Sequence, residues 1–259
     1  MSGSPYMRLA SQSDVPELRE MLINDDRDDY IPDVIEEWIG EKVTYVATDG
    51  REILGMAHKE KAPDGSLWLN GLRVRGSARR KGVGRIISDF MVNLPDANIY
   101  RLVINEVNEA SIGLTLKVGY TERFRASLWV SKTGADEPEW NEVDYEDTGT
   151  ESFNYFGKSG GLIPTSWYAF ELNERAKRVL SDFGLKFVSD RGMNIFLHNR
   201  EHKVITPLVL RKKELLTELP EGYVLFGNIS DDFSPLGFDQ SLWAERLIFF
   251  EYARTRVFH

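Results

Sequence analysis

The feature that most constrains this chain is a basic, glycine-containing loop between a strand-like run and an amphipathic helix. Residues 67–74 have the apolar content of a strand, and residues 84–94 have the apolar spacing of a helix. Between Arg73 and Arg85 six of thirteen residues are basic and none is acidic, although the net charge of the chain is −9. This local reversal of charge indicates a polyanionic ligand.

Two glycines in the loop, Gly82 and Gly84, indicate how such a ligand would be held. A glycine lets the chain turn tightly and lets backbone N–H groups come close to a ligand. The first turn of a helix has unpaired N–H groups and the positive end of the helix dipole, which favour phosphate. The loop therefore predicts a pyrophosphate site. The dinucleotide fingerprint fits poorly because it needs a third glycine, and the Walker A loop fails because Gly-Lys-Ser/Thr is absent.

Residues 79–84, with the sequence RRKGVG, meet the pattern Arg/Gln-x-x-Gly-x-Gly/Ala. Here the chain resembles the GCN5-related N-acetyltransferase (GNAT) superfamily, whose members hold acetyl-CoA on that loop. Residues 71–74 resemble the fourth strand of the family, and residues 105–120, with Asn108 and a closing Gly-Tyr, resemble its second motif. The resemblance implies an α/β fold, the GNAT acyl-CoA N-acyltransferase fold, with a mixed, mostly antiparallel central sheet.

The same resemblance implies the contacts to acetyl-CoA, which is the expected co-substrate. Backbone groups of the fourth strand would polarise the thioester carbonyl, the loop would bind the pyrophosphate, and an asparagine of the second motif would contact the pantetheine arm. The implied coenzyme-binding residues are Leu72, Arg73, Val74, Arg79, Arg80, Lys81, Gly82, Val83, Gly84, Arg85 and Asn108.

Two catalytic groups that are common in the family are missing from their expected places. The tyrosine that often protonates the departing thiolate should fall at position 115, where this chain has Thr115. The fourth strand offers Trp68 and Asn70 to the cleft in place of a glutamate. We therefore expect Glu106, at the end of the fifth strand, to act as the base and Asn70 to orient a water or the amine. A solvated charge at a helix entry is an equally good interpretation of Glu106.

Four aromatic residues are candidates for contact with the acceptor substrate. In the family the first two helices flank the acceptor cleft, which points to Tyr30 and Trp38. Large aromatic residues on short amphipathic helices belong more often to the core. In the C-terminal half Trp167 and Tyr168 could line the same cleft.

The histidines give no sign of a metal site. His58 lies alone on a strand-like run, and we interpret it as structural or surface-exposed. His198 and His202 have helical metal-site spacing but fall across a predicted hairpin turn. No metal is predicted.

A long acidic stretch, residues 136–151, divides the chain. With 259 residues, the chain is long enough for one large domain or two small ones. We expect a GNAT domain over residues 1–134 and a smaller C-terminal α+β domain over residues 135–259. The second domain has no second coenzyme loop, so if it is GNAT-like it is a degenerate half. It would then form a wall of the acceptor cleft.

The composition indicates which partners and which cellular compartment to expect. The chain has no cysteine and no apolar run of membrane-spanning length, which fits a cytoplasmic protein with no membrane partner. The net acidity argues against a nucleic-acid partner, because phosphate backbones are bound by extended basic surfaces. We expect a monomer or a homodimer.

Together these features predict direct transfer of an acetyl group from acetyl-CoA to a primary amine of a small molecule or amino acid. A slight resemblance to histidine N-acetyltransferase-like proteins points to a free amino acid or small amine. Two alternatives stay open. One is a non-catalytic acyl-CoA-binding regulatory module, and the other is an N-acetyltransferase that acts on proteins or peptides.

Overall fold

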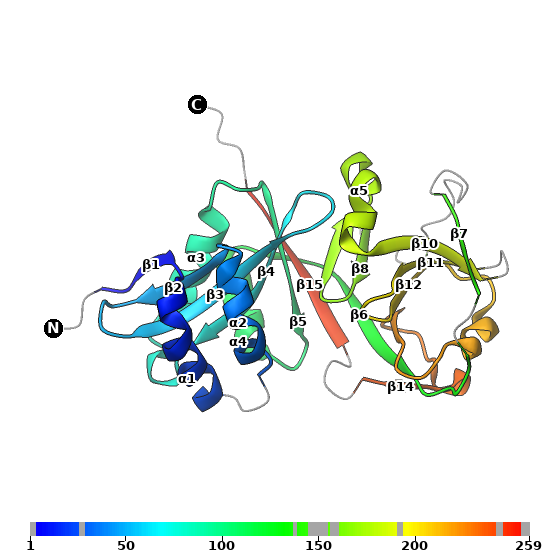
Figure 1. Ribbon diagram of the computed structural model, residues 1–259, viewed down its shortest axis with the longest axis horizontal. Coiled ribbons are helices and arrows are strands. Elements are labelled where there is room, and N and C mark those ends of the chain that lie inside the picture. Colours follow the sequence, from blue (N-terminus) through cyan, green and yellow to red (C-terminus); the bar gives the residue numbers. More distant parts are fainter. Residues whose placement is uncertain are drawn as a thin grey trace.

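The computed structural model describes residues 4–25, 29–136, 139–144, 155, 161–190, 194–241 and 246–254. The described strands form one sheet of thirteen strands and a separate pair, β8 and β9. The large sheet runs through the whole molecule, and the helices of the N-terminal half lie on its left-hand part in Figure 1. None of the helices in the described ranges is long and apolar enough to cross a membrane.

The N-terminal half begins as an antiparallel meander. Its strands are β1 (Tyr6–Leu9), β2 (Thr44–Thr48), β3 (Ile53–Lys61) and β4 (Leu67–Val74), followed by β5 (Ile99–Asn105) and β6 (Thr121–Ser131). β4 and β5 are parallel and are joined by a helical crossover. The mixed, mostly antiparallel sheet that was predicted is therefore confirmed.

Helices cover both faces of this part of the sheet. They are α1 (Val15–Asp25), α2 (Ile31–Gly40), α3 (Val83–Asn93) and α4 (Glu109–Val118), with short 3₁₀ turns η1 (Gln12–Asp14) and η2 (Gly76–Ala78). Val46 and Met56 pack against α1 and α2, whereas Ala47 and Ala57 pack against α3. Successive residues of a strand point to opposite faces, so α1 and α2 lie on one face of the sheet and α3 on the other.

The last strand of the chain returns to the N-terminal half. β15 (Arg246–Ala253) lies between β5 and β6, where Ile248 is opposite both Ile104 and Arg125 (Figure 1). A first domain that ends near residue 134 would therefore take one of its strands from the C-terminal end of the chain. The boundary between residues 134 and 135 stays a prediction.

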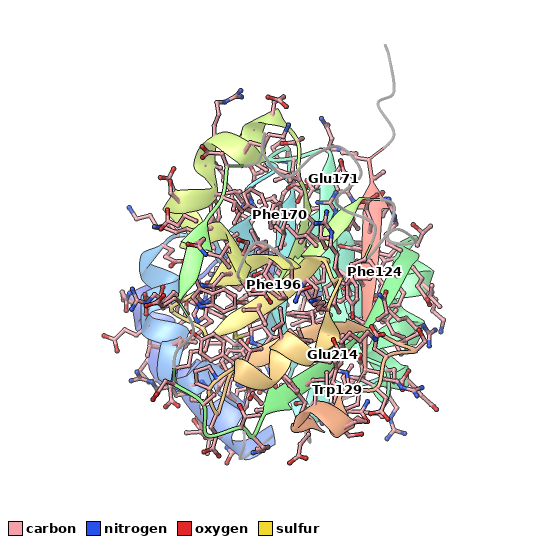
Figure 2. All side chains as sticks on the ribbon, turned by 90° about the vertical axis from the view of Figure 1, so that its right-hand side faces the viewer. Phe124, Trp129, Phe170, Glu171, Phe196 and Glu214 are labelled. Carbon is pink, nitrogen blue, oxygen red and sulfur yellow. The ribbon has the colours of Figure 1, made fainter. Side chains whose placement is uncertain are left out.

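The C-terminal half extends the sheet beyond β6 in the order β13, β12, β11, β10, β7, while β14 pairs with β6. Its strands are β7 (Trp140–Glu142), β8 (Leu162–Thr165), β9 (Tyr168–Glu171), β10 (Leu185–Asp190), β11 (Asn194–Asn199), β12 (Val204–Val209), β13 (Val224–Asn228) and β14 (Phe238–Gln240). Its helical segments are α5 (Glu174–Val179), η5 (Leu180–Phe183), η6 (Lys213–Glu218) and η7 (Ser234–Leu236). Figure 2 shows Phe170 and Phe196, both fully buried, in the interior of this half.

A buried arginine links the two halves. Arg101 on β5 is 1% exposed and forms ion pairs with Asp64 (2.5 Å), Glu251 on β15 (2.7 Å) and Glu171 on β9 (3.1 Å). Although burial acts in the opposite direction, the charge of Arg101 and hydrogen bonds hold the pKa of Asp64 below its usual value. The network joins the β3–β4 turn to strands of the C-terminal half.

Candidate active site

The basic loop leads from the end of β4 into α3, as predicted. Gly82 precedes α3 with φ of 84°, in the left-handed region, and a Cβ atom on it would meet no atom within 4 Å. No side chain of the described residues caps the start of α3. The N–H groups of its first turn are therefore available to an anion, with the positive end of the helix dipole behind them.

Gly84 also serves the packing of α3. A Cβ atom at Gly84 would lie 3.2 Å from Leu114 Cδ2 on α4 and 3.6 Å from Val74 Cγ2 on β4. The residue therefore lets α3 pack closely on its neighbours, and Gly82 is the glycine that leaves the front of the loop open.

Half of the basic residues around the loop hold the fold together. The guanidinium of Arg73 bonds both carboxylate oxygens of Asp29, at 2.7 and 2.9 Å. Arg75 pairs with Glu17 at 2.9 Å, and Arg85 pairs with Asp89 at 2.6 Å.

The rest of the basic set lies on the loop itself. Arg79 donates to the carbonyl oxygen of Val74 at 3.1 Å. Arg80 and Lys81 are exposed and form no ion pair with the described residues. Of the six basic residues, these two are the best placed to bind an anionic ligand from solution.

β4 and β5 separate before β4 reaches the basic loop. They pair only at Leu67 with Tyr100 and at Trp68 with Arg101. Beyond Trp68, the edge of β4 that faces β5 has no strand partner in the described residues. β4 and β5 therefore splay apart beyond Trp68, and backbone N–H groups on this edge of β4 have no strand partner in the described residues.

A β-bulge shapes β4 beside the splay. Its register with β3 shifts between Met56 and His58, and Gly71 has φ of 61°. A Cβ atom on Gly71 would lie 2.7 Å from Cζ3 of Trp38, so a larger residue would displace that indole. The bulge brings α2 into direct contact with the β4 backbone.

Four hydrogen-bond acceptors gather on the α2 side of this bulge, and we call them the acceptor cluster: Glu41, His58, Glu60 and Asn70. The Nε2 atom of His58 lies 3.6 Å from Oε2 of Glu41 and 3.7 Å from Oε1 of Glu60. Asn70 donates its amide to Glu60 Oε1 at 2.5 Å. His58 is fully buried, whereas the side chains of Glu41 and Glu60 are 49% and 44% exposed, so the cluster opens to solvent through its carboxylates.

The electrostatics of the cluster follow from burial and from its crowded negative charge. Burial lowers the pKa of His58 to about 4, so its imidazole is neutral at neutral pH. Burial, and then the charges of Glu60 and Glu37, raise the pKa of Glu41. A cation bound among the carboxylates would lower the raised pKa of Glu41 and would keep His58 neutral.

Aromatic rings surround the cluster, and three of the four predicted substrate contacts are among them. The indole of Trp38 stacks on His58 with ring centroids 4.1 Å apart, and Tyr30 meets Trp38 edge-on at 6.1 Å. Tyr168 lies 6.3 Å from Trp68, and burial and the charge of Glu60 raise its pKa. Trp167 lies on the β8–β9 turn and is 45% exposed.

Three further positions that the sequence singled out have neighbours of their own. Glu106 follows β5 and lies 3.6 Å from Arg125 and 3.5 Å from Arg246. Asn108 caps α4, where its side chain accepts from the N–H of Ser111 at 3.1 Å. Thr115 is buried in α4.

Sequence reasoning missed three members of the cluster. His58 was interpreted as structural or surface-exposed, and Glu41 and Glu60 were not considered. The β3–β4 hairpin held the missing signal, because its register sets His58 opposite Asn70 and Glu60 opposite Trp68. Asn70 was predicted, and it lies in the cluster.

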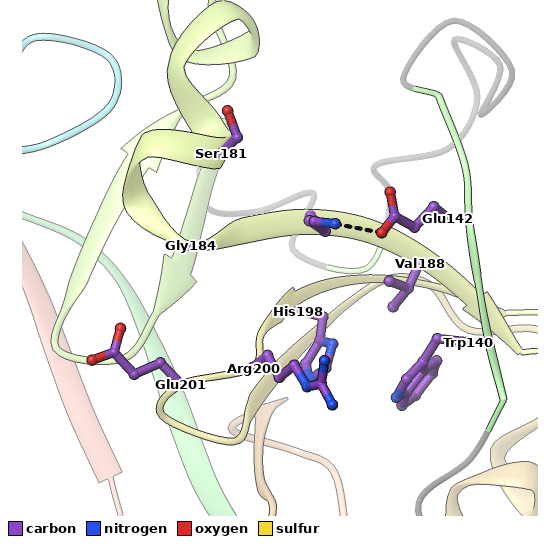
Figure 3. A pocket seen from close by; sticks show the side chains of 9 residues that line it. Trp140, Glu142, Ser181, Gly184, Val188, His198, Arg200 and Glu201 are labelled. Carbon is purple, nitrogen blue, oxygen red and sulfur yellow. Dashed lines mark hydrogen bonds and ion pairs between the residues drawn. The ribbon is translucent and has the colours of Figure 1, made fainter.

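A cavity of about 670 Å³ lies in the C-terminal half (Figure 3). Trp140 and the ion-paired Glu142 and Lys186 line it, together with His198 and Arg200. The indole Nε1 of Trp140 has no hydrogen-bond partner among the described residues. All of its lining residues come from positions 140–201, so it is separate from the site that β4 and α3 build.

Comparison with known proteins agrees with this geometry. Residues 13–120 match the model of the Acetyltransferase (GNAT) family. A search of curated proteins found no match.

Three crystal structures resemble the chain over nearly its whole length. A putative acetyltransferase from Thermoplasma acidophilum shares 18% identity, with a TM-score of 0.65 over 96% of this chain and 99% of that one. A putative acetyltransferase from Pyrococcus horikoshii shares 13% identity, with a TM-score of 0.58 over 97% and 90%. A GCN5-related N-acetyltransferase from Sphaerobacter thermophilus shares 13% identity, with a TM-score of 0.55 over 96% and 95%.

At these identities the three structures establish the fold, and their coverage shows that both halves share it. The family match covers β4, the basic loop, α3 and α4. Residues 13–120 are therefore a domain of the GNAT acetyltransferase family, which uses acetyl-CoA as the acetyl donor.

Proposed function

We propose that this chain transfers the acetyl group of acetyl-CoA to a primary amine that binds at the acceptor cluster. The observation that carries the proposal is the convergence of hydrogen-bond acceptors beside the Gly71 bulge. A protonated primary amine has N–H donors and no acceptor, so it complements such a group of side chains. The amine would approach from the face that α2 covers, and the coenzyme would lie along the splay.

The coenzyme side is assigned from the loop and the splay. The N–H groups at the start of α3, together with Arg80 and Lys81, would bind the phosphates, and the open space in front of Gly82 would admit them. Backbone N–H groups between Leu72 and Val74 would polarise the thioester carbonyl, because this edge of β4 lacks a strand partner in the described residues. Binding both reactants together would supply proximity.

In the reaction the amine nitrogen forms a bond to the carbonyl carbon, the carbon–sulfur bond breaks, and the sulfur leaves as a thiolate. The bound ammonium loses one proton before attack and another afterwards. We assign the base to Glu60, whose carboxylate contacts Asn70 beside the bulge and is exposed enough to pass protons to solvent. Glu106 is the alternative base, but its neighbours are two arginines and not the acceptor cluster.

The leaving group does not require the tyrosine that is absent from position 115. Thr115 is buried, and a thiol has a pKa near 8.5, so a thiolate leaves readily without an acid. The absence of the tyrosine is therefore compatible with catalysis.

Release of free thiol tests the proposal. The protein is incubated with acetyl-CoA and pools of polyamines, arylalkylamines, aminoglycosides, amino acids or short peptides, and free coenzyme A is followed. We expect at least one pool to release thiol, and we expect Glu60→Gln to lower kcat more than tenfold while Glu106→Gln does not.

Two outcomes would contradict the proposal. If a thermal shift shows that acetyl-CoA binds but no pool releases thiol above the Gly82→Trp variant, the chain is a non-catalytic acyl-CoA-binding module. If Glu106→Gln abolishes the pH-dependent rate and Glu60→Gln does not, the base is assigned wrongly.

A further inference from the structure

The neighbours of His58 favour one tautomer of its imidazole. The hydroxyl of Thr44 lies 3.0 Å from the carbonyl oxygen of Trp38, which can only accept, and 2.8 Å from Nδ1 of His58. Because the hydroxyl has one hydrogen, both contacts are hydrogen bonds only when Thr44 donates to Trp38 and accepts from Nδ1. We therefore assign the proton of the neutral imidazole to Nδ1, which leaves a lone pair on Nε2.

Nothing in the described part of the chain donates to that lone pair. His58 Nε2 is buried without a hydrogen-bond partner among the described residues, and so is Oδ1 of Asn70. The nearest groups to Nε2 that carry charge are the carboxylates of Glu41 and Glu60. Leaving buried acceptors unpaired costs free energy, so the group is complete only when a donor enters it.

The donor that fits is an ammonium group. An ammonium carries three N–H donors and a positive charge, which matches a neutral nitrogen acceptor, an amide oxygen and two carboxylates. No group of three or more His, Asp or Glu in the described ranges is arranged to hold a metal ion. The stacked Trp38 and the neighbouring Tyr30 add aromatic faces, which attract alkylammonium ions.

The same surroundings disfavour a carboxylate next to the amine. The guanidinium of Arg73 is already engaged, because Nε and Nη2 donate to the buried carboxylate of Asp29 and Nη1 donates to the carbonyl oxygen of Leu72. A carboxylate on the carbon next to an ammonium bound between Glu41 and Glu60 would be repelled by these two negative charges. Free α-amino acids carry such a group.

We infer that the acceptor is a cationic primary amine whose neighbouring carbon carries no carboxylate, such as an arylalkylamine, a polyamine or a guanidino-alkylamine. This inference rests on the proposed function, because it names the substrate class of the same site. It departs from the free amino acid that the slight sequence resemblance favours.

Matched sets of three amines test the inference. Tyramine, tyrosine and tyrosinamide form one set, and agmatine, arginine and argininamide form the other. Within each set the primary amine is the same, and the neighbouring carbon carries hydrogen, a carboxylate or a neutral amide. The kcat/KM for thiol release is measured for each compound. We expect the carboxylate form to be at least tenfold poorer than both of the others.

The amides separate charge from bulk. If the kcat/KM of the carboxylate compound equals or exceeds that of the other two compounds in its set, the inference is overturned. It is also overturned if the kcat/KM of the amide is as low as that of the carboxylate compound, since size would then explain the difference. Release confined to the pool of free amino acids also overturns it. In each of these cases acetyl transfer itself stands. If none of the six compounds and none of the broader pools releases thiol, the proposed function fails.

A double variant checks the origin of the discrimination. Glu41→Gln/Glu60→Gln removes both negative charges from the cluster and keeps the size of the side chains. Its overall rate should be low, but the ratio of kcat/KM between tyramine and tyrosine should fall at least fivefold toward one. An unchanged ratio would show that these carboxylates do not exclude the substrate carboxylate.

Discussion

The two halves of the molecule each contain a parallel pair of strands that separates after two residue pairs, and only one pair leads to a loop that we assign to the coenzyme. In the N-terminal half β4 and β5 pair at two positions and then diverge. In the C-terminal half β12 and β13 also pair in parallel at two positions, Val204 with Val224 and Ile205 with Leu225. The topology is similar, but the connection that follows each first strand is not.

After β4 the chain enters an open glycine loop and an eleven-residue helix, α3. After β12 it enters the short 3₁₀ segment η6, whose Leu216 packs with Phe233 of the η7 region against Ile205 and Leu225. Apolar side chains thus cover the second pair, whereas the first has an open, basic edge. We propose that the C-terminal half is a second GNAT-like unit that has lost its coenzyme loop.

The strongest way to break this two-part arrangement is to remove the arginine that joins the halves. Arg101→Met would leave the buried carboxylates of Asp64 and Glu251 without their main cation. We expect the free energy of unfolding in a urea titration to fall by about 3 to 5 kcal/mol. Arg123→Met is the control, because the side chain of Arg123 is 27% exposed and its loss is expected to lower the free energy of unfolding much less. A loss below about 1 kcal/mol for Arg101→Met would show that the network does not hold the halves together.

Substitutions at two glycines with similar backbone geometry, one in each half, compare the functions of the halves. Gly82 and Gly222 have φ of 84° and 86°, and a Cβ atom on either would meet no atom within 4 Å. Tryptophan at either position therefore carries a similar backbone cost, about 1 to 2 kcal/mol. We expect Gly82→Trp to reduce thiol release at least 100-fold and Gly222→Trp to leave it within about threefold, after both are checked for folding. Equal losses would mean that backbone strain, and not the coenzyme site, explains the effect.

The buried histidine of the acceptor cluster makes the stability of the N-terminal half sensitive to mild acid. The pKa of His58 is about 4 in the folded chain and 6.5 when unfolded, so the unfolded state binds the extra proton between these values. Its contribution is fully present above pH 6.5 and is lost as the pH falls toward 4, by about 2 kcal/mol between pH 7 and pH 5. Urea titrations at both pH values should show a smaller loss in His58→Gln. Equal losses in the variant and the original chain would assign the acid sensitivity to other groups.

The smallest expected effect is on the KM for acetyl-CoA, when one exposed lysine is removed from the connection after β4 or from the connection after β12. Lys81 lies on the coenzyme loop, and Lys212 follows β12; both are exposed. Lys81→Ala should raise KM for acetyl-CoA about threefold to tenfold, because it removes one exposed charge from the phosphate site. Added salt should shrink this difference. Lys212→Ala should leave KM unchanged, and an equal rise in both variants would indicate a general charge effect.

The strand–loop–helix unit that we assign to the coenzyme could be predicted from the sequence because its signal is contiguous. The strand, the basic loop and the helix follow one another within residues 67–93, and their patterns are local. The roles of the individual residues were less predictable. Whether Arg73 meets a ligand or Asp29 depends on a contact across 44 positions in the chain.

The acceptor cluster needed information that local patterns do not carry. Glu41 ends α2, His58 and Glu60 lie on β3, and Asn70 lies on β4, so they meet only when the hairpin register and the helix position are known. The bulge at Gly71 also reverses which β4 side chains face α2, and a strict alternation would miss it. The return of β15 was equally hidden, because Arg101 and Glu251 are 150 positions apart.

The most direct test of the account is the number of acetyl-CoA molecules that one chain binds. Isothermal titration calorimetry with acetyl-CoA should give one site per chain, and that site should vanish in Gly82→Trp and persist in Gly222→Trp. This result would place coenzyme binding in the N-terminal half alone. Two sites per chain, or a site that survives in Gly82→Trp, would contradict the claim that only the first splayed pair of strands serves the coenzyme.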